Sequence, residues 1–324
     1  MDAQNITLLI KELKSENDDI HERAKNLLIN LGASVVLPLF DALKLEDDES
    51  YDGRLIRDVL LEIGESSVLP IISVLRDENE GSMARRRAAY VLAELADPRA
   101  FEALLDALSD ASSEVRSPAA YGLGKLGDKR ALPALLSALN DESWEVRAEA
   151  AEALGKLGHS QAFTDQLILA LDDENPFVRQ SAVVALGELH DTKAVPPVIE
   201  ALHDDDSLVR QSAAVTLGKL GSALAVQPLI KLLDDEDYPV RYDAISSLGQ
   251  LADRRAVEPL INALKDSDDY LRFKAAQALG QIGAEEALPT LLRMQETDMG
   301  STHGGYNKDM ATEAIASIRQ REQH

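Results

Sequence analysis

The chain has 324 residues, of which 45% are hydrophobic but only 4% aromatic, so we expect a core of Leu, Ala, Val and Ile. It contains no cysteine, which excludes disulfides, thiolate metal sites and a cysteine nucleophile. The formal charge of −24 argues against a general nucleic-acid binder, because such a protein needs a basic surface to displace counterions from phosphates.

Near the N-terminus, two stretches carry apolar residues at helical spacing and end at a glycine. The first runs from Ile20 to Gly32 and the second from Gly53 to Gly64. Both resemble, weakly, a pattern that becomes clear further along the chain. We therefore interpret residues 1–66 as divergent repeats, since terminal copies of a repeat array are usually atypical.

From residue 67 to residue 283 the sequence repeats with a period of about 31 residues. An arginine opens each copy of a phrase such as VRAEAAEALGKLG at 146–158. These marking arginines are Arg85, Arg116, Arg147, Arg179, Arg210, Arg241 and Arg272. A fixed period in this range is typical of stacked supersecondary units, each of which buries its apolar face only against its neighbours.

One period contains two helices joined by a polar turn, as the segment from Asp253 to Gly283 illustrates. Asp253 is a candidate N-cap for a first helix that covers 256–264. Pro259 lies inside this helix, and we expect it to cause a kink. The second helix starts near Tyr270 and ends at Gly283, a residue type that favours helix C-termini.

Each second helix has a single apolar stripe, because its apolar residues stand at −1, +3, +4, +7 and +10 from the marking arginine. A glycine at +8 predicts close approach of a neighbouring helix. These glycines are Gly124, Gly155, Gly187, Gly218, Gly249 and Gly280. After a glycine-rich insertion, residues 308–318 fit a last copy, which brings the predicted total to ten helix pairs.

The phrase D-x-x-A-V-x-P-L-I-x-A-L-x-D…V-R-x-x-A-A-x-A-L-G-x-L-G resembles the HEAT-like repeat family named after phycobilisome lyases, most clearly between Val68 and Gly283. The resemblance implies an all-α α-solenoid of about ten HEAT-like helix-turn-helix repeats forming a right-handed superhelix. Residues 1–324 would be one solenoid, with regular repeats at 67–283 and a C-terminal capping repeat with an inserted loop at 284–324. The second helices would line its concave face.

The resemblance also implies a ladder of Asp–Arg pairs between successive repeats. An aspartate stands six residues before each marking arginine from Arg116 onward, and charge-assisted hydrogen bonds would fix the stacking register. The predicted ladder residues are Asp110, Arg116, Asp141, Arg147, Asp173, Arg179, Asp204, Arg210, Asp235, Arg241, Asp266 and Arg272. A row of arginines that binds phosphates is the alternative interpretation.

We expect a partner to contact the outward positions of the second helices, where tyrosine and arginine are favoured anchors. The predicted contacts are Arg86, Arg87, Tyr90, Tyr121, Val184, Val215, Tyr242 and Phe273. A secondary edge is formed by aromatic residues at the starts of these helices, for which hydrophobic staples are an equal explanation. They are Trp144, Phe177, Tyr238 and Tyr270. The turns between helices hold 18 acidic residues in 36 positions, which either suit helix N-termini or attract a basic partner or divalent cations.

The sequence therefore favours a non-catalytic cytoplasmic scaffold that binds a protein or peptide, with no cofactor, metal, nucleic acid or membrane. The alternative, which follows from the resemblance, is a phycobilin lyase-type protein that attaches, removes or carries a bilin on a phycobiliprotein. It would work with a second HEAT-repeat subunit. A deoxyhypusine-hydroxylase-like enzyme would need several His-Glu pairs for two irons, and only His21-Glu22 matches. We predict no catalytic residue.

Overall fold

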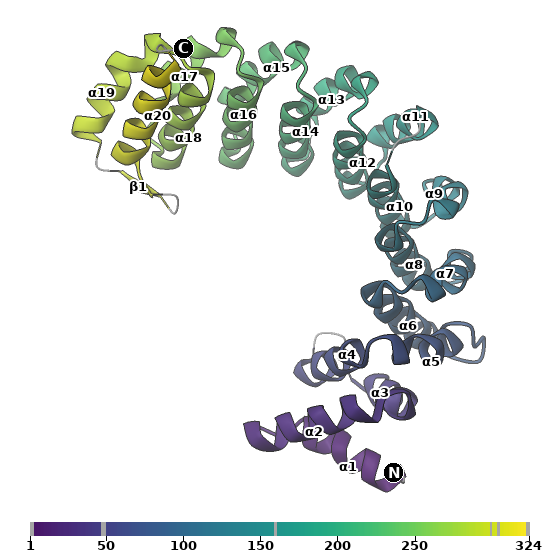
Figure 1. Cartoon of the computed structure of the whole chain (residues 1–324). Coiled ribbons are helices and arrows are strands. Elements are labelled where there is room, and N and C mark those ends of the chain that lie inside the picture. Colours follow the sequence, from purple (N-terminus) through teal and green to yellow (C-terminus); the bar gives the residue numbers. More distant parts are fainter. Residues whose placement is uncertain (1–2, 47–49, 159–160, 299, 303–304, 322–324) are drawn as a thin grey trace. The chain divides into compact units, whose positions relative to one another are not determined.

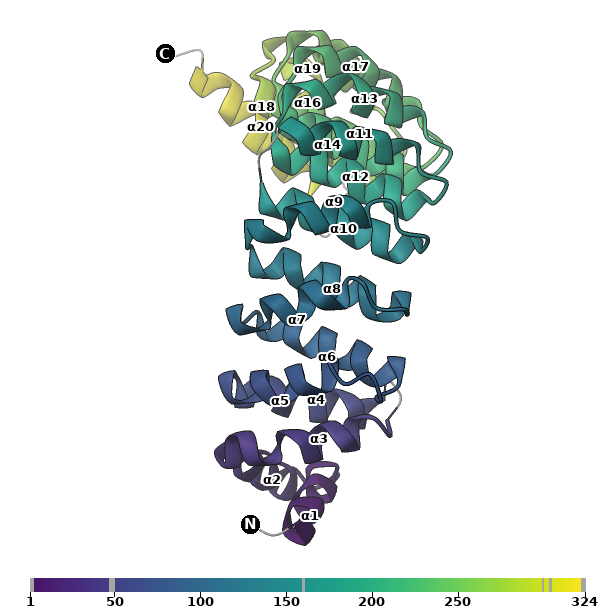
Figure 2. The same cartoon turned by 90° about the vertical axis from the view of Figure 1, so that its right-hand side faces the viewer.

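The computed structural model describes residues 3–46, 50–158, 161–298, 300–302 and 305–321. These residues are almost entirely helical and form two compact units, Met1–Leu157 and Gly158–His324. In the described residues, twenty α-helices make the ten helix pairs that the repeat predicts. Within each unit the helical hairpins stack in chain order (Figure 1), and the turned view shows the same order of α-helices in the first unit (Figure 2).

The first unit contains five hairpins. Its first helices are α1 (Ala3–Leu13), α3 (Val36–Leu43), α5 (Glu65–Leu75), α7 (Phe101–Ala107) and α9 (Leu132–Ala138). Its second helices are α2 (Asp18–Leu31), α4 (Tyr51–Ile63), α6 (Ser82–Leu95), α8 (Ser113–Leu126) and α10 (Trp144–Leu157).

The second unit also contains five hairpins. Its first helices are α11 (Gln161–Leu169), α13 (Val195–Glu200), α15 (Val226–Lys231), α17 (Val257–Ala263) and α19 (Leu288–Thr297). Its second helices are α12 (Pro176–Leu189), α14 (Ser207–Leu220), α16 (Tyr238–Leu251), α18 (Asp269–Ile282) and α20 (Asn307–Arg321). Two short antiparallel strands, β1 (Ser301–Thr302) and β2 (Gly305–Tyr306), lie between α19 and α20.

Short 3₁₀ turns precede or follow many of the first helices. They are η1 (Gly32–Val35), η2 (Pro98–Ala100), η3 (Lys129–Ala131), η4 (Ala170–Asp172), η5 (Thr192–Ala194), η6 (Ala201–His203), η7 (Ala223–Ala225), η8 (Leu232–Asp234), η9 (Arg254–Ala256) and η10 (Glu285–Ala287). The capping aspartates stand before several of these turns. Asp253, for example, accepts a hydrogen bond from the Arg255 backbone N–H at 2.9 Å.

The predicted kink at Pro259 is wrong. The chain passes from the 3₁₀ turn η9 to the α-helix α17 at Val257, so Pro259 is only the third residue of α17. Backbone N–H groups in the first turn of an α-helix have no intrahelical acceptor, and a proline there removes no hydrogen bond. The predicted single helix over 256–264 is thus divided before the proline, where a 3₁₀ turn gives way to an α-helix, and α17 itself needs no kink.

One stretch of the first unit is long and apolar enough to cross a membrane, judged by length and composition alone. It spans residues 18–43, and its most apolar window of 18 residues has a mean hydropathy of 1.6. In the structure it is not one straight helix, because α2 ends at Leu31 and its C-cap, Gly32, has a φ of +56°. Leu39 and Phe40 of α3 are fully buried. This stretch therefore contributes buried side chains to the core of the first hairpins.

Neighbouring second helices approach each other closely at the glycines of the +8 position. A Cβ built on Gly124 of α8 would lie 2.9 Å from the Cα of Ala153 on α10. In the second unit, a Cβ on Gly280 of α18 would lie 2.9 Å from the Cα of Ala314 on α20. Both distances are shorter than carbon atoms tolerate, so the predicted close approach is confirmed.

We expect Gly124→Ala to lower the free energy of unfolding by about 1–2 kcal/mol, because the added methyl group must push two backbones apart. Alanine is the better helix former, so propensity alone predicts a gain. Urea denaturation followed by circular dichroism measures the difference. The control is Gly81→Ala, since Gly81 has a φ of −67° and open space where the Cβ would stand. A stabilised Gly124→Ala variant would contradict the packing argument.

Candidate functional site

A ladder of Arg–Asp pairs holds successive second helices in register. In the first unit, Arg116 Nε and Nη2 both donate to the Asp141 carboxylate at 2.8 Å. The same arginine donates from Nη1 to the main-chain oxygen of Asp110 at 2.9 Å, while the Asp110 carboxylate accepts from Arg85 at 2.7 Å. A ladder aspartate thus accepts hydrogen bonds from two arginines. Its carboxylate binds the arginine of the preceding repeat, and its main-chain oxygen binds the arginine of its own repeat.

The same geometry recurs in the second unit, with two further pairs. Arg179 binds Asp204 through Nε at 2.7 Å, and Arg210 binds Asp235 through Nε at 2.8 Å. Burial alone would raise the pKa of Asp235, but hydrogen bonds from Arg210 and from the backbone N–H of Asp237 more than offset it. The pKa of Asp235 is therefore lowered. These pairs stay ionised at neutral pH and fix how the second helices stand beside one another.

The ladder departs from the prediction at Arg241. Its guanidinium carbon lies 4.0 Å from the ring centroid of Tyr238, and its Nε is buried without a hydrogen-bond partner among the described residues. The Asp266 carboxylate instead accepts from the backbone N–H of Asp268 at 2.8 Å. The predicted Arg241–Asp266 pair is therefore wrong, because the tyrosine ring offers the guanidinium a cation–π contact. The predicted Arg147–Asp173 pair would join the two units and stays a prediction.

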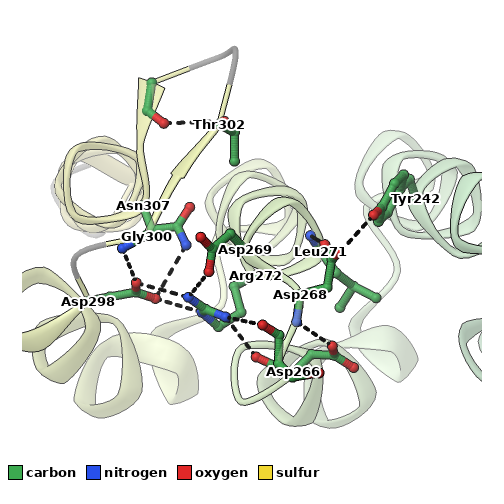
Figure 3. A network of polar contacts seen from close by, with 12 residues as sticks. Tyr242, Asp266, Asp268, Asp269, Leu271, Arg272, Asp298, Gly300, Thr302 and Asn307 are labelled. Atoms are coloured by element: carbon green, nitrogen blue, oxygen red, sulfur yellow. Dashed lines mark hydrogen bonds and ion pairs between the residues drawn. The ribbon is translucent and has the colours of Figure 1, made fainter.

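The last rung of the ladder uses an aspartate that the sequence pattern missed. Arg272 donates from Nε to Asp298 Oδ2 at 2.7 Å and from Nη2 to Asp269 Oδ1 at 2.6 Å (Figure 3). Asp298 also accepts from the backbone N–H of Gly300 at 2.8 Å, which ties the start of the β1–β2 segment to the ladder. Asp298 was missed because no marking arginine stands six residues after it.

A cavity of about 320 Å³ opens on the second helices of the first unit. Residues of α4, α6, α8 and α10 line it, together with the end of α3. Its aromatic and charged lining residues are Arg57, Arg86, Arg87, Tyr90, Tyr121 and Glu149. Four of these six residues were among the contacts predicted from the sequence, whereas Arg57 and Glu149 were not.

Two stacked tyrosines form one wall of the cavity. The ring centroids of Tyr90 and Tyr121 are 6.3 Å apart with an interplanar angle of 16°. The Tyr121 hydroxyl donates to Glu94 Oε1 at 2.8 Å, and burial together with this carboxylate raises the pKa of Tyr121 to about 12. Tyr90 is 41% exposed. The pair is therefore a neutral, fixed aromatic platform whose open side faces solvent.

The three arginines of the cavity have different surroundings. Arg57 is half-buried, with its guanidinium carbon 5.6 Å from the Tyr90 ring centroid, and Arg86 is also half-buried. Arg87 is only 9% exposed, and its two terminal nitrogens donate to the main-chain oxygens of Leu43 and Glu46. The expectation that Arg87 projects outward is therefore corrected, since it ties α6 to the end of α3.

The one acidic side chain among the described lining residues is Glu149 of α10. Burial, with a smaller contribution from the negative charge of Glu152, raises the pKa of Glu149 to about 7. At neutral pH this carboxyl is close to half-protonated, so it can either donate or accept a hydrogen bond. Its signal in the sequence was only an acidic residue at an outward position.

The remaining predicted contacts lie on second helices of the second unit. Val184 is exposed, while Val215 and Tyr242 are half-buried. Phe273 is only 7% exposed and stacks on Tyr270 with ring centroids 6.3 Å apart. The expectation that Phe273 faces a partner is corrected, because its ring closes against the preceding turn of α18.

The aromatic residues at the starts of the second helices are mostly open to solvent. Trp144, Phe177 and Tyr238 are exposed, whereas Tyr270 is half-buried and packs edge-on against Tyr242 at 4.7 Å. The Tyr242 hydroxyl donates to Asp268 Oδ2 at 2.9 Å (Figure 3). In the second unit, neighbouring rings thus contact one another in the series Tyr238, Tyr242, Tyr270 and Phe273.

The only predicted fragment of a metal site is the pair His21-Glu22. His21 Nδ1 lies 2.6 Å from the main-chain oxygen of Leu13. This contact resembles that of the marking arginines, which donate to main-chain oxygens in the preceding turn. Within the described part of the chain, no cluster of three or more histidine and acidic side chains could hold a metal ion.

The stacked hairpins and the repeated Arg–Asp pairs define an α-helical repeat protein. The family model for HEAT repeats matches residues 101–165, 164–248 and 226–301, and the model for the PBS lyase HEAT-like repeat matches residues 84–110. Because the HEAT repeat matches span more than half of the chain, the protein belongs to the HEAT-repeat family. The comparison with curated proteins gave no match.

Several solved structures are similar in fold. The Escherichia coli protein YibA is 22% identical, with 85% of this chain and 99% of YibA covered and a TM-score of 0.62. An engineered protein is 21% identical, with 98% and 99% covered and a TM-score of 0.52. A third similar chain comes from a structure of Kap95p with RanGDP, in which Kap95p binding induces the switch loops of RanGDP to adopt the GTP-bound conformation. It is 13% identical, with 99% of this chain and 55% of that chain covered and a TM-score of 0.60.

Proposed function

We propose that this HEAT-repeat protein is a non-catalytic scaffold that binds a peptide segment of a partner protein on the second helices of the first unit. The cavity beside Tyr90 and Tyr121 is the observation that carries this proposal. Its volume of about 320 Å³ accommodates one or two side chains of a bound segment. Aromatic rings and arginines, the residue types that line it, are those enriched at binding hot spots.

The ladder supports this function by ordering the surface before a partner arrives. Arg85 and Arg116 fix α6, α8 and α10 through their carboxylate partners, and Tyr121 is held by Glu94. A preordered surface loses little conformational entropy on binding, so more of the contact energy appears as affinity. The Kap95p–RanGDP structure supplies an example of a similar fold that binds a protein.

The test is selection of peptides from a random display library on the full-length chain, followed by affinity measurement with variants. We expect Tyr90→Ala and Tyr121→Ala each to weaken binding of the selected peptides about 10-fold or more, as at hot spots. The control is Tyr51→Ala, since Tyr51 is 67% exposed in the same unit but does not line the cavity. Unchanged affinity in both cavity variants would refute the proposed surface.

A bilin-binding role on a phycobiliprotein, with or without a lyase partner, is the second candidate. It is favoured by the match of residues 84–110 to the PBS lyase HEAT-like repeat, because this segment contains Arg86 and Tyr90 of the cavity. Titration of a free bilin into the full chain would shift its visible absorbance if the cavity bound it. The shift would be lost in Tyr90→Ala. A spectrum equal to that of the free bilin would reject this candidate.

A further inference from the structure

A row of apolar side chains lies exposed at the starts of three second helices in the second unit. Phe177 is the second residue of α12, Leu208 is the second residue of α14, and Tyr238 is the first residue of α16. The three residues are 45–49% exposed. Helix α14 packs against both α12 and α16 (Figure 1), and ladder pairs join the turns that precede the three helices. Phe177, Leu208 and Tyr238 therefore follow one another along one side of this unit, and we call this row the apolar edge.

Helix capping does not explain the apolar edge. A hydrophobic staple uses the residue before the N-cap, whereas all three apolar residues follow the N-caps of their helices. These N-caps are Asn175, Asp206 and Asp237. In the first unit, the position that corresponds to Phe177 and Leu208 holds the exposed residues Glu114 and Glu145, which suit the N-terminal end of a helix dipole. The second unit thus exposes apolar side chains where glutamate serves the same helices equally well.

The turns that lead into these helices are strongly acidic. Residues 172–177, 203–208, 234–239 and 265–270 together hold thirteen acidic residues and one lysine. The marking arginines of this unit that reach these turns number only four, and they are Arg179, Arg210, Arg241 and Arg272. Even when all four are counted against the carboxylates, the turns keep a large excess of negative charge around the apolar edge.

A cavity of about 470 Å³ lies between two of these turns, directly before α14 and α16. Its acidic lining residues are Asp204, Asp205, Asp234, Asp235 and Glu236. Its basic lining residues are Arg210, which is bound to the carboxylates of Asp235 and Asp237, and the exposed Lys231. Five carboxylates against two cations leave room and negative charge for a further positive side chain.

We propose that the apolar edge and the acidic turns beside it form a second docking surface, which binds an extended basic segment of a partner protein. Apolar side chains of that segment pack on Phe177, Leu208 and Tyr238. Its lysine or arginine side chains face the acidic turns, and one of them enters the cavity before α14 and α16. Charge complementarity of this kind steers a partner and fixes its register. The same negative charge repels nucleic acid and anionic membranes, which bind to basic surfaces.

The spacing of the helices sets the sequence of the bound segment. Neighbouring packed helices are about 10 Å apart, and an extended chain covers that distance in about three residues. The segment therefore carries an apolar residue at about every third position, with lysine or arginine between. This surface lies wholly within the second unit, so it does not depend on the cavity of the first unit.

The test is selection from a random-peptide display library on the full chain carrying Tyr90→Ala, a change that weakens the first-unit cavity, and in parallel on the wild type. We expect both selections to yield peptides rich in lysine and arginine with an apolar residue at about every third position. Fluorescence anisotropy of a labelled peptide from the Tyr90→Ala selection then gives its affinity. Failure to obtain such peptides would overturn the inference.

Leu208→Glu separates docking on the apolar edge from simple attraction of charges. It installs the residue type that Glu114 and Glu145 provide in the first unit, so the helix should form normally. We expect the basic peptide to bind about 10-fold more weakly, as on loss of a hot spot, whereas attraction of charges alone predicts tighter binding to the more acidic variant. Phe177→Glu is the second variant. Unchanged or tighter binding to both variants would overturn the inference, while thermal unfolding shows that each is folded.

The acidic part of the surface is tested by changing Asp205→Asn and Glu236→Gln together. We expect weaker binding of the basic peptide at low salt and a smaller further loss on adding salt than in the wild type. Glu313→Gln is the control, since Glu313 is an exposed acidic residue on α20 of the same unit. Equal effects of the two changes would show that these turns do not recognise the basic residues. Peptides that depend on Tyr90 should bind Leu208→Glu normally, so the proposed function and this inference can fail separately.

Discussion

Replacing Arg210 with alanine is expected to lower the free energy of unfolding by about 3–5 kcal/mol, the cost of breaking a buried ion pair from one side. Arg210 is 8% exposed. It donates to the Asp235 carboxylate at 2.8 and 2.9 Å and to the main-chain oxygen of Asp204 at 2.9 Å. Its removal leaves a partly buried carboxylate and a main-chain oxygen without their donor. Urea denaturation followed by circular dichroism measures the loss.

Two comparisons separate the effect of the ladder pairs on stability from the effect of removing any charged side chain. Arg254→Ala removes an exposed arginine paired with Glu286 and should change stability by less than about 1 kcal/mol. Asp235→Asn and Asp266→Asn change the carboxylates of equivalent residues, of which only the Asp235 carboxylate binds a ladder arginine. We expect Asp235→Asn to be clearly the more destabilising. Equal effects would show that the Arg–Asp pairs do not determine repeat stacking.

The pH dependence of the Asp235 effect has a definite sign. The pKa of Asp235 is lowered in the folded state, so the folded protein holds its proton less tightly than the unfolded chain. The stabilisation is therefore fully present above the unfolded pKa and is lost as pH falls through the folded pKa. The difference between the wild type and Asp235→Asn should shrink in acid.

Replacing Glu149 with glutamine is expected to raise the free energy of unfolding at pH 8 by about 1–2 kcal/mol and to change it little at pH 5. The pKa of Glu149 is raised from 4.5 to about 7 in the folded protein. Between these values the folded state binds a proton that the unfolded chain has released. The stability of the wild type therefore falls as pH rises through this window, whereas glutamine carries no charge to bury.

The measurement is urea denaturation of both proteins at pH 5, 6, 7 and 8. The groups that share the surroundings of Glu149 are Glu152 and Lys156 on its own helix and the cavity residues of α4, α6 and α8, chiefly Arg57, Arg86 and Tyr121. Glu114→Gln is the control, since Glu114 is exposed on α8 and should show the same small effect at every pH. If Glu149→Gln did not raise the free energy of unfolding more at pH 8 than at pH 5, the raised pKa of a buried Glu149 carboxyl would be refuted.

The period of the sequence was enough to predict the architecture. Helix pairs, capping residues such as Asp253, and the glycines at +8 all follow from local rules that repeat along the chain. The weak copies at 20–32 and 53–64 also proved to lie in second helices, α2 and α4, whose C-caps are Gly32 and Gly64. Each of these features depends on neighbours within one period or in the adjacent one, and the repeat makes those neighbours known.

The site was harder to predict because it depends on individual exceptions to the repeat. Arg57 stands at a +4 position, which is apolar in the regular copies, so the pattern assigned it no outward role. Arg87 and Phe273 occupy positions that face outward in other repeats, but local partners hold them inside: two main-chain oxygens and the Tyr270 ring. Arg241 changed partner because a tyrosine stands three residues before it. The partner of each of these side chains depends on how it packs in its own repeat, and the repeat period alone does not predict that packing.

The double use of each ladder aspartate has a consequence for how such a chain can change in length. Arg179 binds Asp204, and Arg210 binds Asp235, each 25 residues further on. Loss of residues 180–210, one whole period, would place Asp235 at that same separation from Arg179. Insertions and deletions of whole periods therefore preserve every joint between hairpins, while the residues that face a partner vary freely from copy to copy.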